Sequence, residues 1–320
     1  MICLGIDTSN YTTSAALYDS STGAFREKRR NLPVEQGGRG LRQSDAVFLH
    51  VKQLPEILEE LLAEHMPGGG LFSLDGVGVS VRPRDTAGSY MPCFLAGELG
   101  ARSAALARGI PLYRFSHQAG HIAAALVGAK RLDLLKQEFL AMHLSGGTTE
   151  VLLVRPGNEH PFDAAILCET LDLNAGQLID RVGVMLGLSF PAGGGLEGLA
   201  AVGCISNKPN PAIKDGNCCL SGIENKCLAM LDKGESPADI ALFCQMSVGA
   251  AAAEMAQTAS RFHPGLPFLF AGGVIRNEMV RSMIAERVPQ AILAPAELSS
   301  DNAVGIASLA ALHHREGLPC

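Results

Sequence analysis

The sequence contains no tryptophan and only four tyrosines in 320 residues. Because the hydrophobic fraction is nevertheless 47%, the core must consist mainly of aliphatic side chains, and the length is sufficient for two domains. An apolar run of 18 residues is also missing, which argues against a membrane-spanning helix. The N-terminus lacks the basic start and long apolar stretch of a signal peptide. We therefore expect a globular cytoplasmic protein that is not associated with a membrane.

Cysteine pairs with C-x-x-C spacing are absent as well, although the chain has nine cysteines. Neither a zinc knuckle nor a disulfide framework is indicated, and a reducing compartment fits. The net charge of −6 argues against a domain that holds nucleic acid by bulk charge, so no DNA binding is expected. One local basic run remains, and its simplest interpretation is a solvated loop. It consists of Arg26, Lys28, Arg29, Arg30, Arg39 and Arg42.

A short motif of small hydroxyl residues occurs twice. The segments TSNYTTS (8–14) and LSGGTTE (144–150) share the pattern S-x-x-T-T, and Ser9 and Ser145 are 136 positions apart (145 − 9). Each motif stands between two apolar runs, which predicts a hairpin turn. In a duplicated fold two such turns can face each other across a cleft and bind the phosphates of a nucleotide. The alternative is a pair of ordinary hairpins without a ligand.

Strands and helices are predicted to alternate in both halves of the chain. Predicted strands cover 2–8, 13–19, 76–81, 111–116, 138–145, 148–155, 164–169, 267–273 and 291–295. Predicted helices cover about 94–108, 174–187, 236–262 and 301–315, and two more begin near 117 and 275, whereas 203–235 is expected to be irregular. This alternation is typical of α/β layers with largely parallel sheets. We place one domain at 1–129, a second at 130–300, and a C-terminal helix that packs toward the first domain at 301–320.

Glycine-rich turns in the second half are candidate nucleotide contacts. Gly272 and Gly273 end a predicted buried strand, where ligands of open α/β sheets bind, and the helix that follows favours negative charge. Asn277 is a candidate partner for a ribose, as is Asp180, which precedes the glycine-rich segment 190–198. Each signal is weak alone, but three such turns in one domain favour a nucleotide.

Two histidines, His117 and His121, have the spacing that places both rings on one face of a helix. Two ligands of one metal ion require this arrangement, and Asp301 is a candidate third ligand. Two imidazoles and a carboxylate suit iron or zinc. Because H-x-x-x-H is unspecific without a second motif, a pair of surface histidines is the alternative.

Taken in order, these segments resemble a known family. The motifs are GIDTS, HQAGH, LSGGTTE, ETLDLNAGQLIDRVGVMLGL, PAGGG, LSGIEN, AGGVIRN and SDNA. As a co-linear set over nearly the whole chain, they are similar to the TsaD/Gcp family of tRNA threonylcarbamoyladenosine synthases, within the actin/sugar-kinase/chaperone ATPase superfamily. The resemblance implies an α/β fold of two tandem ribonuclease-H-like domains with an interdomain nucleotide cleft.

The resemblance also implies a reaction, in which threonylcarbamoyl-adenylate donates its threonylcarbamoyl group to N6 of the adenosine beside the anticodon of tRNA and AMP leaves. It implies a metal ion on His117, His121 and Asp301, and partner proteins similar to TsaB and TsaE. The adenine nucleotide, whether the adenylate, AMP or ATP, is expected to contact Ser145, Gly146, Gly147, Asp180, Gly193 and Asn277.

The sequence departs from the family near the reacting groups. Tyr11 and Thr12 replace an acidic pair, and Thr148 replaces a histidine. The family segment G-P-G-L is replaced by residues 82–85, RPRD. Candidate catalytic residues are Asp7, Thr12 and Thr148, and we expect weak or partner-dependent transfer.

Other functions are compatible with the same motifs. The first alternative is a nucleotide- and metal-binding paralogue without transferase activity, which acts as a scaffold or regulator. A small-molecule kinase would need a carboxylate base, for which Asp7 or Asp85 could serve. A metallopeptidase is disfavoured because no glutamate stands between the two histidines as H-E-x-x-H requires.

Overall fold

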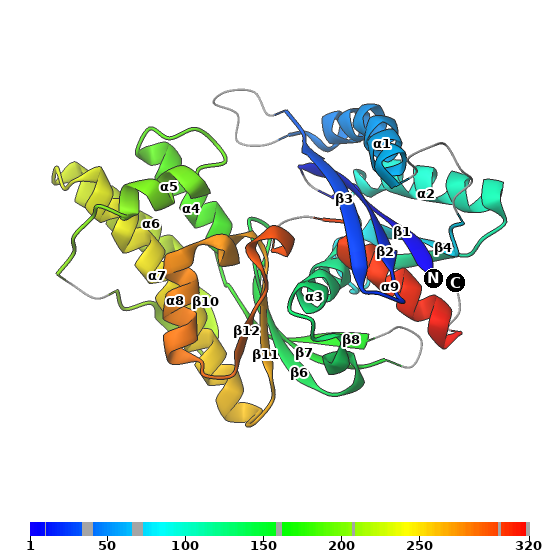
Figure 1. Ribbon diagram of the computed structural model, residues 1–320. Helices are drawn as coiled ribbons and strands as arrows, with labels where there is room; N and C mark the ends of the chain where they lie inside the picture. Colours follow the sequence, from blue (N-terminus) through cyan, green and yellow to red (C-terminus); the bar gives the residue numbers. More distant parts are fainter. Residues whose placement is uncertain are drawn as a thin grey trace.

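The computed structural model describes residues 1–9, 11–33, 41–65, 73–157, 162–206, 209–299 and 302–317. These residues form two five-stranded sheets flanked by helices (Figure 1). The first sheet has the strand order β3-β2-β1-β4-β5, and the second has the order β12-β11-β6-β7-β8. Read from its other edge, the second sheet repeats the first strand by strand, in both order and chain direction. The duplication predicted from the two hydroxyl motifs is therefore a duplication of the whole sheet.

Each sheet combines an antiparallel meander with two parallel strands. The first sheet contains β1 (Ile2–Asp7), β2 (Thr12–Asp19), β3 (Ala24–Asn31), β4 (Gly76–Arg82) and β5 (Leu112–Ser116). The second contains β6 (Phe139–Leu144), β7 (Thr149–Pro156), β8 (Phe162–Glu169), β11 (Phe268–Ala271) and β12 (Ala291–Leu293). Strands β1–β3 and β6–β8 pair antiparallel, and the others pair parallel. The predicted tandem α/β fold is confirmed, but the sheets are mixed rather than largely parallel, because each repeat opens with two hairpins.

Helices cover both faces of each sheet. Helices α1 (Gln43–His65) and α2 (Phe94–Arg108) pack on the outer face of the first sheet. Five helices lie on the outer side of the second sheet: α4 (Ala175–Met185), α5 (Gly193–Ala200), α6 (Ser221–Asp232), α7 (Pro237–Phe262) and α8 (Glu278–Arg287). Between the two sheets lie α3 (His117–Gly128) and α9 (Val304–Glu316) (Figure 1), which share one core with strands of both. We call the first sheet with α1 and α2 the first lobe, and the second sheet with α4–α8 the second lobe.

Short elements complete the described chain. They are the 3-10 helices η1 (Leu132–Lys136), η2 (Gly273–Arg276) and η3 (Ala296–Leu298) and the small strand pair β9 (Ala212–Lys214) and β10 (Asn217–Cys219). The region 203–235, which we expected to be irregular, thus contains α6 and this strand pair. Among the described residues, no helix is both long and apolar enough to span a membrane.

Glycine allows α9 to approach its neighbours closely. A Cβ atom on Gly305 would lie 1.8 Å from the carbonyl oxygen of Gly120 on α3. On Gly5 of β1 it would lie 2.5 Å from the carbonyl oxygen of Ala303, at the start of α9. Helix α9 therefore connects α3 to the first sheet through backbone contacts. The domain boundaries at residues 129 and 300 stay a prediction.

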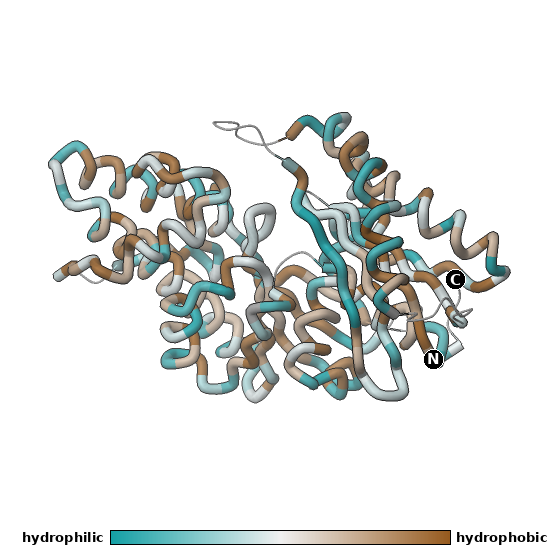
Figure 2. Tube along the Cα trace, turned by 45° about the horizontal axis from the view of Figure 1, so that its top comes forward, coloured by the Kyte–Doolittle hydropathy of each residue, from teal (hydrophilic) through white to brown (hydrophobic). Residues whose placement is uncertain are grey.

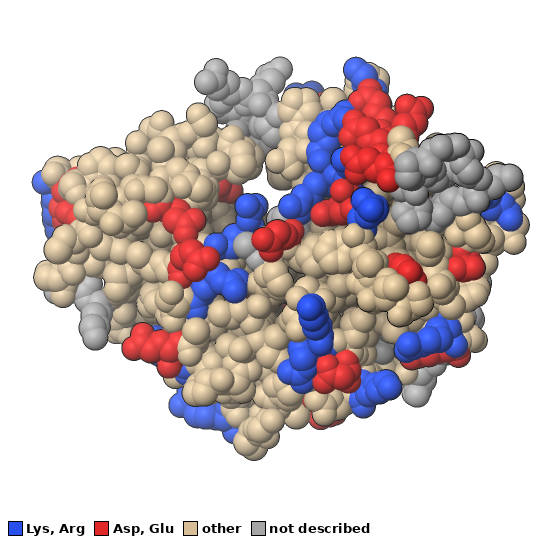
Figure 3. All heavy atoms as spheres, viewed as in Figure 1, with Lys and Arg blue, Asp and Glu red and all other residues tan. Residues whose placement is uncertain are grey.

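Four residues of the predicted basic loop, Arg26, Lys28, Arg29 and Arg30, lie on strand β3, which is hydrophilic along most of its length (Figure 2). Lys28 and Arg30 point to α1, where they form ion pairs with Glu56, Glu60 and Glu64. A column of basic side chains consequently lies beside a column of acidic ones in the space-filling view (Figure 3). Because the acidic residues of α1 neutralise much of this strand, the expectation of a solvated loop is wrong for these four residues. Arg42 is exposed and lies outside the strand, just before α1. Arg39 lies outside the described residues.

Candidate nucleotide and metal site

The two hydroxyl motifs form hairpin turns at equivalent places, between β1 and β2 and between β6 and β7. In the first turn, the Ser9 N–H donates to Asp7 Oδ1 over 2.8 Å. In the second, the Gly147 N–H donates to Ser145 Oγ over 3.2 Å. A small polar side chain therefore organises each turn, as the repeated sequence pattern suggests.

Backbone is accessible at several of the predicted nucleotide-binding glycines. A Cβ atom on Gly146, Gly147 or Gly273 would meet no other atom within 4 Å. Gly193, the first residue of α5, has only Ile179 near its Cβ position, at 3.9 Å. Gly272 differs, because its φ is +102° and a Cβ atom would lie 2.3 Å from the carbonyl oxygen of Leu144. Packing alone thus requires glycine at 272, whereas the other glycines leave room for a ligand.

The predicted ribose contacts each have a structural partner. Asp180 Oδ1 accepts a hydrogen bond from the Ala192 N–H over 2.8 Å, and burial raises the pKa of this carboxyl group. Asn277 caps α8, because its Oδ1 accepts from the Val280 N–H over 2.9 Å. These bonds fix both side chains next to the glycines that begin α5 and those that precede α8. A carboxylate and an amide each retain further hydrogen-bonding capacity for a ligand.

The two lobes meet across a hollow in the molecular surface (Figure 3). Tyr11, in the first hairpin turn, contacts Phe190 of the second lobe edge to face, with ring centroids 6.1 Å apart. Phe190 stands three residues before Gly193 at the start of α5. The first turn therefore lies close to a glycine-rich segment of the opposite lobe.

The two predicted metal-binding histidines are buried side by side on the first two turns of α3. Their Nε2 atoms lie 2.9 Å apart, and His117 Nδ1 lies 2.8 Å from Asp7 Oδ2. A third imidazole, His143 of β6, has its ring centroid 4.5 Å from that of His121. Sequence reasoning missed His143, because one histidine in an apolar strand carries no spacing signal.

The geometry of the pair fits a metal ion. Two nitrogens bonded to one ion at about 2.1 Å and near a right angle are about 3 Å apart, which the Nε2 separation matches. Asp301 lies outside the described residues, and within them no group of three or more His, Cys, Asp or Glu side chains is arranged to hold an ion. The structure thus brings together two of the three predicted ligands.

The candidate catalytic residues lie at the two turns: Asp7 ends β1, Thr12 begins β2, and Thr148 lies in the second turn. Asp7 is 1% exposed. Thr12 is also buried, and its Oγ1 donates to Asn31 Oδ1 over 3.3 Å. Thr148 is half-buried. Of the three, only Thr148 lies where solvent or a substrate has partial access.

An ion pair between a partly exposed arginine and a buried glutamate connects the lobes near the histidines. Arg84 follows β4, and its Nη2 atom lies 3.3 Å from Oε2 of Glu150 on β7. Glu150 is fully buried. Gln118 of α3 donates to the other carboxylate oxygen of Glu150. Burial raises the pKa of Glu150, and the Arg84 charge offsets part of this effect. Arg84 belongs to residues 82–85, the segment that we expect from the sequence to differ from the family pattern.

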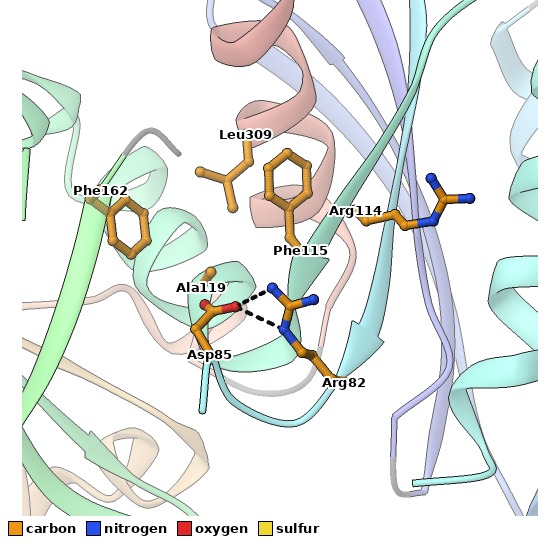
Figure 4. A pocket seen from close by; sticks show the side chains of 7 residues that line it. All are labelled: Arg82, Asp85, Arg114, Phe115, Ala119, Phe162 and Leu309. Carbon is orange, nitrogen blue, oxygen red and sulfur yellow. Dashed lines mark hydrogen bonds and ion pairs between the residues drawn. The ribbon is translucent and has the colours of Figure 1, made fainter. Parts of the chain in front are cut away.

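The same segment also holds the start of α3. Arg82 donates two hydrogen bonds to Asp85 Oδ1, at 3.0 and 2.7 Å (Figure 4). Ser116, the N-cap of α3, donates to Asp85 Oδ2 over 2.5 Å. Figure 4 shows these charged groups on one side of a small pocket, with Phe162 of the second lobe on the other. The RPRD segment thus anchors the helix that carries the histidine pair.

Duplicated sheets of this topology, with hairpin turns and glycine-ended strands between the lobes, define the class of actin-like ATPase folds. A family model described as TsaD, tRNA N6-adenosine threonylcarbamoyltransferase, matches residues 34–308, and the chain therefore belongs to the TsaD family. This confirms the resemblance seen in the motifs.

Relatives with the same description are similar over most of their length. The tRNA N6-adenosine threonylcarbamoyltransferase of Methanopyrus kandleri is 28% identical over 99% of this chain and 89% of its own. That of Streptococcus pneumoniae strain CGSP14 is 32% identical over 81% of this chain and 76% of its own.

Solved structures with the same fold are more distant in sequence. HypF from T. kodakarensis has a TM-score of 0.64 at 15% identity. The match covers 99% of this chain and 48% of the HypF chain. The activator of 2-hydroxyisocaproyl-CoA dehydratase from Clostridium difficile, solved with bound ADPNP, has a TM-score of 0.56 at 14% identity, covering 99% of this chain and 97% of that one. At these identities the similarity shows the fold alone.

Proposed function

We propose that this chain transfers a threonylcarbamoyl group from threonylcarbamoyl-adenylate to N6 of the adenosine beside the anticodon of tRNA. The observation that carries the proposal is the buried His117–His121 pair between the lobes of a TsaD-family fold. Open glycine backbone on the second hairpin turn and at the start of η2 supports a nucleotide in the same cleft. We further propose that the protein acts in the cytoplasm.

In the proposed reaction, the N6 amine of adenosine attacks the carbamoyl carbon. The bond from that carbon to the phosphate oxygen breaks, AMP leaves with the electron pair, and the amine loses a proton. A metal ion on His117, His121 and Asp301 would supply Lewis acidity and a template for the two substrates. The turn formed by Ser145, Gly146 and Gly147 would bind the nucleotide through N–H and hydroxyl groups. Much of the rate would come from positioning.

The replaced residues on the hairpin turns lead us to expect weak or partner-dependent transfer. A missing acid or base typically costs about 100- to 10,000-fold in rate. The variant Tyr11→Asp, Thr12→Glu, Thr148→His restores the family's groups and should raise the rate. The assay is mass spectrometry of unmodified tRNA incubated with adenylate donor and partner proteins. If neither protein modifies tRNA while both bind nucleotide, the transferase proposal is wrong.

Such an outcome would favour the second candidate, a nucleotide- and metal-binding paralogue without transfer activity. Two observations support this candidate specifically. Thr12 is buried against Asn31, and Glu150 is neutralised by Arg84, so neither presents an acid or base toward solvent. A paralogue of this kind would retain the ligands of both sites and lack turnover.

Nucleotide binding is tested separately from turnover. Asp180→Ala should weaken AMP binding by roughly 10-fold, as expected for the loss of a hydrogen bond to a charged group. The control is Asp163→Ala, which removes an exposed carboxylate from β8. Calorimetry with metal present measures both variants. No binding of AMP or ATP by the natural chain would refute the nucleotide site.

Metal binding is tested by elemental analysis of the purified protein. The natural chain should contain about one iron or zinc ion, and the variant His117→Ala, His121→Ala should contain almost none, because two of three protein ligands are lost. The control His263→Ala removes an imidazole at the end of α7, away from the pair. Equal metal content in the natural chain and the double variant would contradict the site.

We also propose that the chain binds a protein partner similar to TsaB or TsaE through the outer face of α1 and α2. Large apolar side chains are exposed there by 49% to 74% of their area: Phe48, Val51, Leu95, Leu99 and Leu106. Exposed apolar patches of this kind mark interaction sites. Leu99→Glu with Leu106→Glu should abolish partner binding in gel filtration, whereas Val202→Glu, at an exposed site on the second lobe, should not. Equal binding by both variants would place the interface elsewhere.

A further inference from the structure

Asp7 lies directly behind the histidine pair, and both of its carboxylate oxygens are engaged. Oδ1 accepts the Ser9 N–H over 2.8 Å, and Oδ2 lies 2.8 Å from His117 Nδ1. The residue is the last of β1, and it is paired with Ser14 of β2 across the sheet. The carboxylate therefore has a fixed position at the end of a central strand.

This contact determines which nitrogen of His117 carries the proton. An ionised carboxylate only accepts hydrogen bonds, so Nδ1 must be the protonated nitrogen of a neutral His117 ring. The lone pair then lies on Nε2, which faces His121 Nε2 at 2.9 Å. Metal-bound histidines typically donate their second ring N–H to a carboxylate in this way.

We infer that Asp7 is a positioning residue, which holds His117 in the tautomer and orientation that present Nε2 to a metal ion. The inference rests on the proposed metal site. It assigns Asp7 a role different from that of a catalytic residue, for which the sequence made it one of three candidates. With 1% exposure and both oxygens engaged, Asp7 receives no proton from a substrate without leaving His117.

The first test uses the natural, metal-free chain and needs no substitution. Long-range proton–nitrogen NMR correlations of protein labelled with ¹⁵N-histidine report the tautomer of each ring, and the His117→Ala spectrum assigns the signal. We expect the neutral His117 ring to be protonated on Nδ1. A proton on Nε2 instead would overturn the inference, whether or not the protein binds metal.

The second test compares Asp7→Asn with Asp75→Asn. An amide can donate to Nδ1 and thereby force the opposite tautomer. Asp75 is the matched control, because it also accepts a backbone N–H, from Ile2 over 2.7 Å, but at the other end of β1. Chelator competition should show a 10- to 100-fold loss of metal affinity for Asp7→Asn, with a changed visible spectrum of the Co²⁺ form, and no loss for Asp75→Asn.

The outcomes separate the two proposals. Equal affinity and equal Co²⁺ spectra in the natural chain and Asp7→Asn would overturn the role of Asp7 while the metal site stands. Absence of metal binding by the natural chain would contradict the metal site itself, and the tautomer measurement would then decide the role of Asp7. Thermal melts of both variants establish that they are folded. If Asp7→Asn does not fold, the tautomer measurement on the natural chain decides the role of Asp7.

Discussion

The crossing of α3 and α9 leaves no space for even one additional methyl group. At Gly305, a Cβ atom would lie 1.8 Å from the Gly120 carbonyl oxygen and 2.7 Å from the Ala124 nitrogen. A carbon and an oxygen in contact are about 3.3 Å apart, so Gly305→Ala must separate the helices by roughly 1.5 Å. Both neighbouring atoms belong to backbone, and no side-chain rotation can relieve the clash.

The cost of this substitution can be estimated. Overpacking typically destabilises by about 1–3 kcal/mol, and two rigid backbones place this case near 3 kcal/mol. Alanine regains at most about 1 kcal/mol of helix propensity over glycine. We therefore expect Gly305→Ala to lower the free energy of unfolding by about 2 kcal/mol. Urea titration measures this quantity directly.

Metal affinity should fall together with stability, because α3 carries both histidines and α9 begins three residues after Asp301. Metal–ligand distances tolerate about 0.2 Å, far less than the expected separation. The matched control is Gly198→Ala, since a Cβ atom on this helical glycine of α5 meets nothing within 4 Å. Gly198→Ala should be as stable as the natural chain or more so. Equal stability of the two alanine variants would refute the reasoning from close packing.

Three further predictions follow from charge and backbone conformation. Burial raises the pKa of Glu27 from 4.5 to about 7. The folded state thus holds this proton more tightly than the unfolded state, so its contribution to stability is complete below pH 4.5 and is lost as the pH rises through 7. Glu27→Gln should remove this loss and be more stable than the natural chain at pH 8, by at most about 3 kcal/mol. Urea titrations of both proteins at pH 5 and pH 8 measure the difference. The same pH dependence of stability in both proteins would contradict the prediction. Arg84→Ala should lower the free energy of unfolding by about 3 kcal/mol, because it leaves Glu150 buried without its cation. Glu150→Gln should lower it less, because the partly exposed Arg84 can turn to water. The reverse order of stability in denaturant titrations would contradict the pairing. Gly272→Ala should lower the free energy of unfolding by more than about 2 kcal/mol, because of the positive φ of Gly272 and its contact with Leu144. A variant that melts at the same temperature as the natural chain would disprove this.

Local patterns in the sequence predicted the elements whose signals are strong. Ser236, followed by Pro237, predicted the start of α7, and the Ser236 side chain accepts the Asp239 N–H as a cap requires. The recurrence of Ser9 at Ser145 predicted the duplication. Strand β3 was not predicted, because its charged sequence lacks the apolar alternation of a strand. Helix α1 was missed although Leu54, Ile57 and Leu61 recur at helical spacing and pack on the core. Pro55, which lies inside this helix, weakens the helical signal.

The site was predictable only in part, for a related reason. Spacing on one helix identified His117 and His121, but their contacts with Asp7 and His143 join residues that are far apart in sequence. The packing of α3 against β1 and β6 determines those contacts, and no local pattern encodes it. The Arg84–Glu150 pair likewise depends on how the two lobes meet.

Helix α9 has a consequence for the order in which the protein assembles. It covers β1 through Gly5, yet it is translated about 300 residues later. Until then, the face of the first sheet that carries Cys3, Tyr18 and Phe115 lacks the helix that covers it in the native core. Contacts over such a sequence separation form slowly, and exposed apolar surface invites aggregation. The half of the protein that leaves the ribosome first is therefore completed last, and we expect it to depend on chaperones during synthesis more than the second half does.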